Sequence, residues 1–370
     1  ALMLSLTALP VLSVLPAYLW FRDVSLAPWL WALAFLLLNE LSITAGYHRL
    51  WAHRAYKAHP ALKWFYAVFG GMAVQNSILI WATGHRRHHA HVDDVDQDPY
   101  SARRGFWFSH LGWMLRDHPS SRLQFERAPD LLEDPVVMFQ HKHYLWFAFG
   151  SNFGLVLLLG AVYGDLWGFV LVTGFLRLFA SHHLTFFINS LAHIWGRQPY
   201  TTTNTARDND LIALLTMGEG YHNYHHHFQW DYRNGIRWWH LDPTKWWIAA
   251  CAYLGLARDL RRVPEFKIQH ARVLCQFERA RDAMGRASRH SSRRFDELKA
   301  QLDVEWNHYS EMMSRWAQLQ AEKLASAREQ LIQKWDNSDL RHRMELRALE
   351  LSMRLQHRRL AFFRRKLSPV

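Results

Sequence analysis

The sequence predicts an all-α integral membrane protein with four transmembrane helices, a helical cap on one side of the membrane and a long helical C-terminal extension. Four apolar stretches interrupt a polar background, and each has the length of about 20 residues that a helix needs to cross a bilayer core. From Arg286 to Ser368 the chain contains neither glycine nor proline, which favours long uninterrupted helices. We expect a membrane domain over residues 1–262 and an extension over residues 263–370.

The four predicted spans pair into two helical hairpins. They cover residues 2–20, 28–47, 144–162 and 166–190. The connectors Phe21–Ala27 and Tyr163–Asp165 are short, and no cationic segment precedes the first apolar run, which favours a span over a signal peptide. The polar region between the hairpins, residues 49–142, holds about a dozen lysines and arginines. The positive-inside rule therefore places this region and both termini in the cytoplasm.

Two shorter apolar segments, Ala61–Val74 and Lys245–Leu260, are predicted to be helices that lie on the membrane surface. Both are too short to span a bilayer. They are expected to form part of the cap.

An apolar stripe runs along the C-terminal extension. Its residues recur every three or four positions, as on one face of a helix: Phe295, Leu298, Leu302, Trp306, Tyr309, Met313, Trp316 and Leu319. A break at Asp336–Asp339, with Ser338 or Asp339 as N-cap, predicts a hairpin or coiled coil. Such a stripe favours packing or homo-oligomerisation, and contact between a cationic face and anionic lipid is an alternative.

The charge of the extension bears on its partners. The formal net charge of the chain is +12, and residues 265–370 hold 22 basic and 14 acidic residues. Nucleic-acid binding is not expected, because the basic residues are interleaved with acidic ones along helices.

Histidines at helical spacing are the candidate functional residues. Two triplets repeat the spacing that places three imidazoles on one helix face: His85, His88 and His89, and His222, His225 and His226. His48 and His53 follow the second span, and Asn189 and His193 lie four residues apart where the fourth span ends. These residues are too many for one tetrahedral zinc and suit two metal ions of higher coordination number. Iron is favoured, because a nitrogen-rich site open to a small ligand can activate dioxygen by redox chemistry.

Three sequence motifs resemble the histidine boxes of integral-membrane acyl-lipid desaturases. They are His48-Arg49-Leu50-Trp51-Ala52-His53, His85-Arg86-Arg87-His88-His89 and Gly218-Glu219-Gly220-Tyr221-His222-Asn223-Tyr224-His225-His226. The resemblance is strongest to the stearoyl-CoA (acyl-CoA Δ9) desaturase family and covers roughly residues 15–262. The chain looks like a bacterial-type member with an added C-terminal extension.

This resemblance implies a cytosolic cap, a di-iron centre and a kinked tunnel for an acyl chain. One metal would be held by His48, His53, His85, His89 and His225. The other would be held by His88, His193, His222 and His226, with Asn189 acting through a water. The centre would use dioxygen and external electrons to remove two hydrogens from adjacent methylenes, whose C–H bonds offer no handle to acid–base catalysis. The neighbouring His227 is not expected to bind either metal.

Further residues are expected to contact the substrate or to orient the ligands. The resemblance implies substrate contacts at Asn76, Trp81, Arg116, Thr185 and Phe186. Glu40 in the second span, Asp98 and Glu219 are expected to hold ligand histidines by hydrogen bonds, and a hydrated crevice is the alternative for Glu40. Thr83-Gly84 and Asp117 replace head-group contacts of animal acyl-CoA enzymes, so an acyl carrier protein or a phospholipid is kept beside acyl-CoA as the acyl carrier.

The resemblance also implies an external electron donor, since the sequence has no flavin, haem or cysteine-cluster motif. A ferredoxin, a rubredoxin or a cytochrome b5 would serve, and the C-terminal extension could also dock this donor. In a bacterial setting the enzyme would lie in the inner membrane with its site facing the cytoplasm. A fatty-acyl or alkane hydroxylase and an alkene-forming decarboxylase are alternatives on the same scaffold. A membrane scaffold that binds zinc and acts through its C-terminal helices is the alternative of another class.

Overall fold

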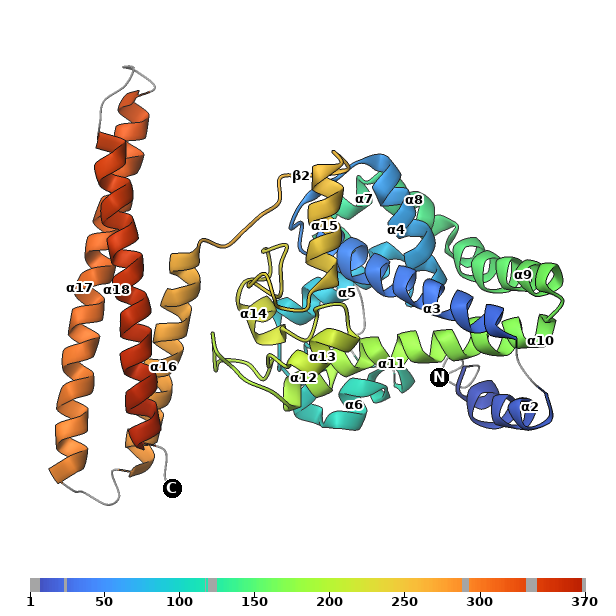
Figure 1. Cartoon of the computed structure of the whole chain (residues 1–370), viewed down its shortest axis with the longest axis horizontal. Helices are drawn as coiled ribbons and strands as arrows, with labels where there is room; N and C mark the ends of the chain where they lie inside the picture. The colour runs from blue at the N-terminus through green and yellow to red at the C-terminus, as the bar shows by residue number, and fades with distance from the viewer. Residues whose placement is uncertain are drawn as a thin grey trace. The chain divides into compact units, whose positions relative to one another are not determined.

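The computed structural model describes residues 7–22, 25–116, 118, 125–287, 293–330 and 338–367, and these are mostly helical (Figure 1). The chain forms two compact units. The first contains Ala1–Gln198 and Thr203–Arg262, and the second contains Pro199–Thr202 and Val263–Val370. Within the described residues the sheet structure is one short antiparallel pair, in which β1 (Lys57–Ala58) pairs with β2 (Ala257–Arg258).

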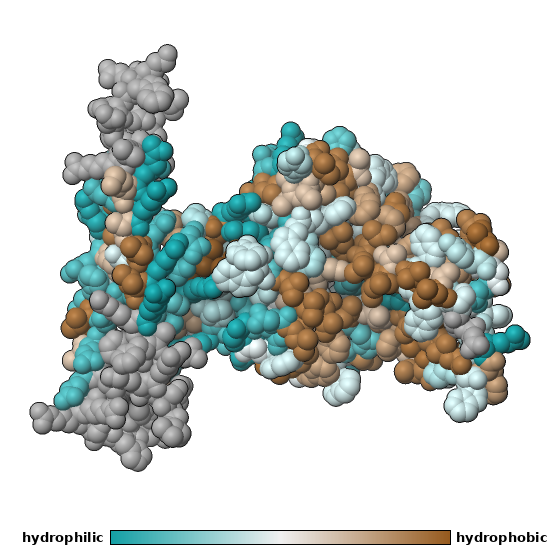
Figure 2. Space-filling view, viewed as in Figure 1, coloured by the Kyte–Doolittle hydropathy of each residue, from teal (hydrophilic) through white to brown (hydrophobic). Residues whose placement is uncertain are grey.

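Among the described residues of the first unit, three helical stretches are long and apolar enough to cross a membrane: Leu26–Ala52, Trp146–Tyr163 and Leu166–Ile194. They consist of α3 (Leu26–Leu41) and η2 (Ser42–Ala52), of η7 (Trp146–Leu155) and α9 (Val156–Tyr163), and of α10 (Leu166–Gly168), η8 (Phe169–Leu176), α11 (Arg177–Asn189) and α12 (Leu191–Ile194). These stretches match the second, third and fourth predicted spans. Many of their apolar side chains are exposed, as expected of helices that face lipid, and apolar surface is extensive on this unit (Figure 2).

The first predicted span is represented by a shorter apolar helix, Thr7–Phe21, which contains η1 (Pro10–Val14) and α2 (Leu15–Phe21). Residues 1–6 lie outside the described residues. A fourth span therefore stays a prediction.

The shorter helices of the first unit pack against the three long apolar stretches and against one another. They are α4 (Pro60–Met72), α5 (Ile78–Ala90), η3 (Ala102–Arg104), α6 (Phe106–His110), η4 (Gly112–Leu115), η6 (Phe125–Arg127), α7 (Pro129–Leu132), α8 (Pro135–Lys142), α13 (Asp210–Leu215), α14 (His222–His227) and α15 (Pro243–Tyr253). Two of them, α4 and α15, fall in the segments predicted to lie on the membrane surface. A Cβ atom on Gly70 of α4 would lie 2.3 Å from the Tyr47 ring, so glycine allows α4 to pack tightly on η2.

A buried polar cluster around Arg177 of α11 joins α3, η7 and the end of α4. The Arg177 guanidinium donates to Asn39 Oδ1 at 2.9 Å, to the Met72 carbonyl at 3.1 Å and to Asn152 Oδ1. Its Nε donates to the carbonyl of Thr173, one turn earlier in the same helix, at 3.1 Å. The arginine therefore links α3, η7 and the end of α4 through neutral partners.

The second unit contains three long helices, α16 (Glu265–Ala287), α17 (Arg293–Gln330) and α18 (Ser338–Leu367). Val273 and Phe277 of α16, Tyr309 and Met312 of α17 and Met353 of α18 form its core. The predicted pair of helices is thus joined by a third, α16. Of the expected break at Asp336–Asp339, the first two residues lie outside the described residues, and α18 begins at Ser338, one of the two predicted N-cap positions.

Candidate metal centre

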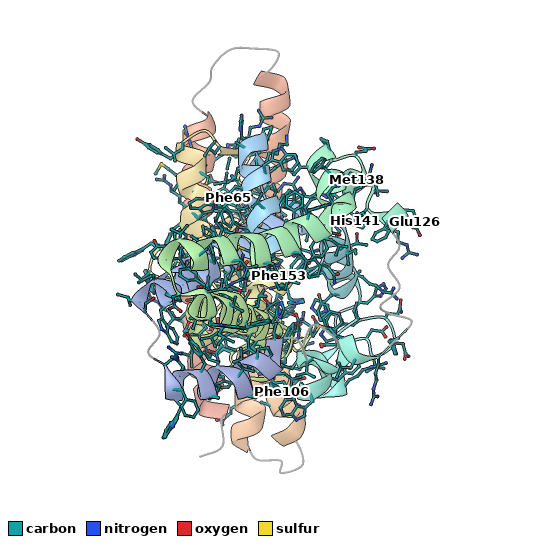
Figure 3. All side chains as sticks on the ribbon, turned by 90° about the vertical axis from the view of Figure 1, so that its right-hand side faces the viewer. Phe65, Phe106, Glu126, Met138, His141 and Phe153 are labelled. Carbon is teal, nitrogen blue, oxygen red and sulfur yellow. The ribbon has the colours of Figure 1, made fainter. Side chains whose placement is uncertain are left out.

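Four helical elements and the residue directly after one of them supply the nine histidines of the candidate site. His85, His88 and His89 are on α5, and His222, His225 and His226 are on α14. His193 is on α12, His48 is within η2, and His53 follows it directly. Helix α5 begins at Ile78, and the Ser77 hydroxyl caps it by accepting from the backbone N–H of Ile80. Ser77 Oγ also lies 2.7 Å from His141 Nδ1 on α8, a histidine labelled in Figure 3.

The first pair of histidines depends on an unusual helical turn. Segment η2 is π-helical, and the backbone N–H of His53 donates to the carbonyl of His48, five residues earlier, at 3.0 Å. In a π-helix, residues five apart come to the same face, whereas in an α-helix they would diverge. The two imidazole centroids accordingly lie 4.7 Å apart. The sequence predicted one ligand on a helix and one on the turn beyond it, and the π-helical turn was not foreseen.

The nitrogens of the nine imidazoles converge in two groups. The first group is His48, His53, His85, His89 and His225. The second group is His88, His193, His222 and His226. Within each group the ligand atoms all lie within 4.8 Å of one another. The membership of the groups is the same as the division that the sequence resemblance implied.

Distances between Nε2 atoms suit a shared metal ion. In the first group they are 3.0 Å for His48 and His225 and 2.9 Å for His53 and His85. In the second group His222 Nε2 lies 3.1 Å from those of both His193 and His226. Metal–nitrogen bonds of 2.0–2.1 Å place neighbouring ligands about 2.9–3.4 Å apart in octahedral or tetrahedral geometry. A cluster of aromatic nitrogens without a thiolate favours transition metals.

Burial keeps these imidazoles available as ligands. Burial, with a further contribution from neighbouring imidazoles, lowers the pKa of His85, His89, His222, His225 and His226 well below the usual value. Neutral imidazole is the form that coordinates a metal. The arrangement and the protonation state therefore fit two metal ions, and coordination itself stays a prediction.

Glu219 links the first group to a buried ion network. Its carboxylate lies 2.9 Å from His48 Nδ1 and 2.9 Å from Arg49 Nη2. Burial alone would raise the pKa of Glu219, but His48 and Arg49 hold it below its usual value. The same guanidinium lies 3.0 Å from Asp242, which accepts from the backbone N–H groups of Asn234 and Gly235. The predicted position of Glu219 beside a ligand histidine thus extends into a network that the sequence did not reveal.

Asp98 takes the corresponding position beside the second group. Its Oδ1 lies 2.8 Å from His88 Nδ1, and it also accepts from the backbone N–H groups of Asp93 and Tyr100. His193 Nδ1 lies 2.8 Å from the Thr205 hydroxyl, which donates to Asp93 at 2.6 Å. Such contacts fix the ring orientation and the tautomer of a metal-ligating histidine.

Glu40 has a different partner from the one expected, and two further polar residues lie near the histidines. Glu40 is 2% exposed and accepts from the Ser181 hydroxyl at 2.7 Å, and among the described residues none of the nine histidines forms a hydrogen bond with it. His182 Nε2 on α11 lies 3.0 Å from the carbonyl of Ala73, the residue after α4. Asn189 is half-buried on the cavity wall, and its predicted part in metal binding through a water stays a prediction.

A cavity of about 490 Å³ opens from the histidine groups between α5, η7 and α11. His48, His85 and His222 are among its lining residues, and the other lining residues are mostly apolar. Four predicted substrate residues line it: Asn76, Trp81, Thr185 and Phe186. Arg116 is exposed and outside the cavity lining, and Asp117 lies outside the described residues.

A glutamine not singled out from the sequence bridges two of the lining residues. Gln75 Nε2 donates to the Thr185 hydroxyl at 2.8 Å, and Gln75 Oε1 accepts from the Trp81 indole at 3.4 Å. The bridge joins α5 to α11 beside the histidines. Next to it, the backbone N–H of Asn76, whose φ is +75°, donates to the Tyr144 hydroxyl at 3.0 Å.

The fold and the site together describe a protein with apolar helices long enough to cross a membrane and with two histidine groups that could each hold a metal ion, beside an apolar cavity. The sequence model described as "Fatty acid desaturase" matches residues 23–261. The chain belongs to the fatty acid desaturase family.

Several relatives carry more specific names. A probable acyl-CoA desaturase of Schizosaccharomyces pombe is 45% identical over 241 residues, which are 65% of this chain and 50% of the relative. Acyl-CoA desaturase 1 of Saccharomyces cerevisiae is 43% identical, over 66% of this chain and 48% of the relative. Stearoyl-CoA desaturase 5 of Bos taurus is 40% identical, over 65% and 73%. The chain thus spans about half the length of the two yeast relatives.

Proposed function

We propose that the protein is an oxygen-dependent desaturase that introduces a cis double bond at the Δ9 position of a long-chain acyl group carried on CoA. The observation that carries the proposal is that two groups of convergent imidazoles each contribute to the lining of a largely apolar cavity. The names of the acyl-CoA and stearoyl-CoA desaturases that the chain resembles support the substrate class. A Δ12-desaturase of Acheta domesticus is 41% identical, so the position of the double bond rests on the sequence resemblance alone.

In this proposal the two histidine groups would hold two iron ions, and Asn189 would act on the second through a water. Bound iron supplies the redox chemistry with dioxygen that an unactivated methylene requires. The acyl chain gives up two hydrogen atoms, and these, with two electrons and two protons from outside, convert dioxygen into two waters. Glu219 and Asp98 keep His48 and His88 in their orientations through contacts of 2.9 and 2.8 Å between a carboxylate oxygen and Nδ1.

The cavity positions the acyl chain and excludes water from it. The bridge from Gln75 to Trp81 and Thr185 fixes the wall between α5 and α11 beside the histidines. Which methylenes pass the metals then depends on the path that this wall imposes, so regioselectivity is a positioning effect. Exposed Arg116 is available to a polar head group outside the cavity.

We also propose the setting of this enzyme. Residues 1–262 would form a four-span domain with its site and both termini in the cytoplasm, and residues 263–370 would form an added extension. A separate carrier such as a ferredoxin, a rubredoxin or a cytochrome b5 would supply the electrons. The relatives named above are eukaryotic, so the bacterial inner membrane has no support from them.

Lipid analysis of a host that expresses the protein tests the proposal. The wild type should produce new cis double bonds, whose position mass spectrometry of derivatised acyl chains determines. His225→Ala should abolish them. His227→Ala is the matched control, because His227 is the next residue along α14 but is exposed and outside both groups, and it should retain activity.

Other products would identify the alternatives. Hydroxylated acyl chains or terminal alkenes without new internal double bonds would indicate a hydroxylase or a decarboxylase. Two zinc ions per chain, with no oxygen-dependent turnover after iron loading and addition of a donor, would favour a structural scaffold. Either outcome would replace the proposed function.

A further inference from the structure

Helix α18 has two apolar faces, and only one is used within the second unit. Met353 is 1% exposed and packs in the core of the unit with Tyr309 of α17. Met344, Leu351 and Leu355, in contrast, are 65%, 59% and 49% exposed. Spacings of seven and four residues place these three on one side of the helix, about 180° from Met353. The inward packing of α18 therefore leaves a second apolar stripe without a partner in the unit.

Arginines border this second stripe. Arg347, Arg354 and Arg358 are exposed and lie on one flank of the stripe, within about 80° of its centre. None of the three forms an ion pair with another described residue. We call Met344, Ala348, Leu351 and Leu355, together with these three arginines, the outward face of α18.

Positive charge in the second unit is concentrated in the same helix. Helix α18 contains nine basic and three acidic residues, whereas α17 contains six basic and seven acidic residues. The basic flank is thus a property of α18 and does not extend to its neighbour. Figure 2 shows hydrophilic and apolar side chains interleaved on the surface of this unit.

We propose that the outward face of α18 binds the anionic lipid surface of the membrane in which the protein resides. Exposed leucine and methionine side chains of an amphipathic helix enter the boundary between head groups and acyl chains. Arginines at the edge of such a stripe contact lipid phosphates, and their long side chains can reach the interface. The covalent link to a unit with three helices able to span a bilayer gives α18 a high effective concentration at that surface.

Charge favours lipid over a second copy of this chain. In a symmetric antiparallel contact through the outward face, the flank with Arg347, Arg354 and Arg358 would face the same flank of the other copy. Like charges along a helix–helix seam are destabilising. An anionic lipid surface supplies the opposite charge along the whole helix.

A fluorophore on the outward face tests the proposal in the full-length protein. A Leu351→Cys variant can be labelled with an environment-sensitive dye, because the native Cys251 and Cys275 are both buried. The protein is placed in nanodiscs of phosphatidylcholine alone or with one third phosphatidylglycerol. We expect the emission to shift to shorter wavelength in the anionic discs and to return in high salt. A label at Ser314→Cys, on an exposed position of α17, should show no shift.

Charge reversal separates specific lipid contact from general attraction. Arg347→Glu with Arg354→Glu should lower the ratio of bound to free α18 by more than tenfold, since each basic residue near an anionic surface contributes about 1 kcal/mol. Lys267→Glu with Arg281→Glu makes the same change of charge on exposed positions of α16 and should preserve the shift. Circular dichroism should show unchanged helix content in both variants.

Three results would overturn the proposal. One is equal emission in the neutral and anionic discs, and another is an anionic shift that survives the reversal on α18. The third is an emission shift that requires a second protein. If the shift depends on protein concentration and the particle mass doubles, the partner is a second copy of this chain. If the shift occurs in neutral discs only when an acidic redox carrier is added, the partner is that carrier.

Discussion

The protein buries two arginines in unlike surroundings. Arg49 and Arg177 are 1% and 2% exposed. Arg49 contacts the carboxylates of Glu219 and Asp242, whereas the partners of Arg177 are side-chain amides and backbone carbonyls. The desolvation of a buried guanidinium is costly in both places, and the two networks offset it by different means.

The difference follows from what each network holds. The carboxylates around Arg49 lead to His48 Nδ1, so this network sets the orientation and the electrostatics of a candidate metal ligand. The carbonyls and amides around Arg177 belong to α3, η7 and the end of α4, so this network joins helices and contacts none of the nine histidines among the described residues. Ionised partners thus occur at the candidate site, and neutral partners occur where only helix packing is at stake.

Acidification of the metal-free protein should have the largest effect on stability. It should act on the histidine groups beside the Arg49 network and not on the Arg177 network. Burial lowers the pKa of His85, His89, His222, His225 and His226, so below about pH 6.5 the unfolded chain binds protons that the folded chain does not. Stability is then lost as the pH falls, by up to about 1.4 kcal/mol per histidine and pH unit.

Thermal unfolding of chelator-treated protein in detergent between pH 7.5 and 5.5 measures this effect. The change in Tm caused by Arg177→Met should be the same at both ends of that range, because that cluster contains no histidine or carboxylate among the described residues. A Tm that does not depend on pH would show that the buried imidazoles titrate normally.

Arg49→Met should have the next largest effect, on both stability and metal content. It leaves Glu219 and Asp242 buried without their cation, which costs about 3–5 kcal/mol. Iron per chain, measured by elemental analysis after reconstitution, should fall with it. Adding Asp242→Asn to this variant removes one unpaired carboxylate and should restore part of the stability. Full metal content in Arg49→Met would show that the network around Arg49 is not needed for metal binding by the histidine groups.

Arg177→Met should destabilise the protein without changing its metal content. The substitution leaves the acceptor groups of Asn39, Asn152 and Met72 with fewer donors, at a cost of about 2–3 kcal/mol. Thermal unfolding gives the loss of stability, and elemental analysis of the folded fraction gives the iron. Loss of iron comparable to that of Arg49→Met would contradict the proposed difference between the two networks.

Asn152→Asp should have the smallest effect. It gives Arg177 a carboxylate at the position of a present hydrogen-bond acceptor, but it removes the donations of Asn152 Nδ2 to the carbonyls of Met72 and Ala148. The Coulombic gain should nearly cancel the added desolvation and these lost hydrogen bonds, to within about 1 kcal/mol. In an Arg177→Met background the same carboxylate has no cation, so Asn152→Asp should lower the free energy of unfolding several times more than it does with Arg177 present. A double-mutant cycle from thermal unfolding measures the coupling, and additive effects would show that the two side chains do not interact.

Much of the candidate site follows from sequence spacing. The triplets on α5 and α14 are three and four residues apart, and a helix turns that spacing directly into convergence. The division of nine histidines into two groups needed the family resemblance, because spacing within one helix does not determine which nitrogens meet across helices. The bridge made by Gln75 was missed, since glutamine at a helix entrance has no distinctive pattern.

Long-range polar partners were the least predictable part. Asp242 lies nearly two hundred residues after Arg49, and no local pattern connects them. Glu40 was expected beside a histidine, but in the structure Ser181 of a different span donates to it. Arg177 was not singled out, although an ionisable residue inside an apolar stretch is itself a signal of a structural or functional role.

The π-helical turn of η2 limits how the first histidine motif can vary. Removing one residue between His48 and His53 would let this segment continue as an ordinary α-helix with four-residue spacing, and the pair would still share a face. Adding one residue would rotate His53 away by roughly a quarter of a turn and leave neither helical form able to restore it. We therefore expect natural or engineered changes in the length of this segment to be tolerated when one residue is removed but not when one is added. The number of residues between His48 and His53 thus restricts how the sequence of this span can vary.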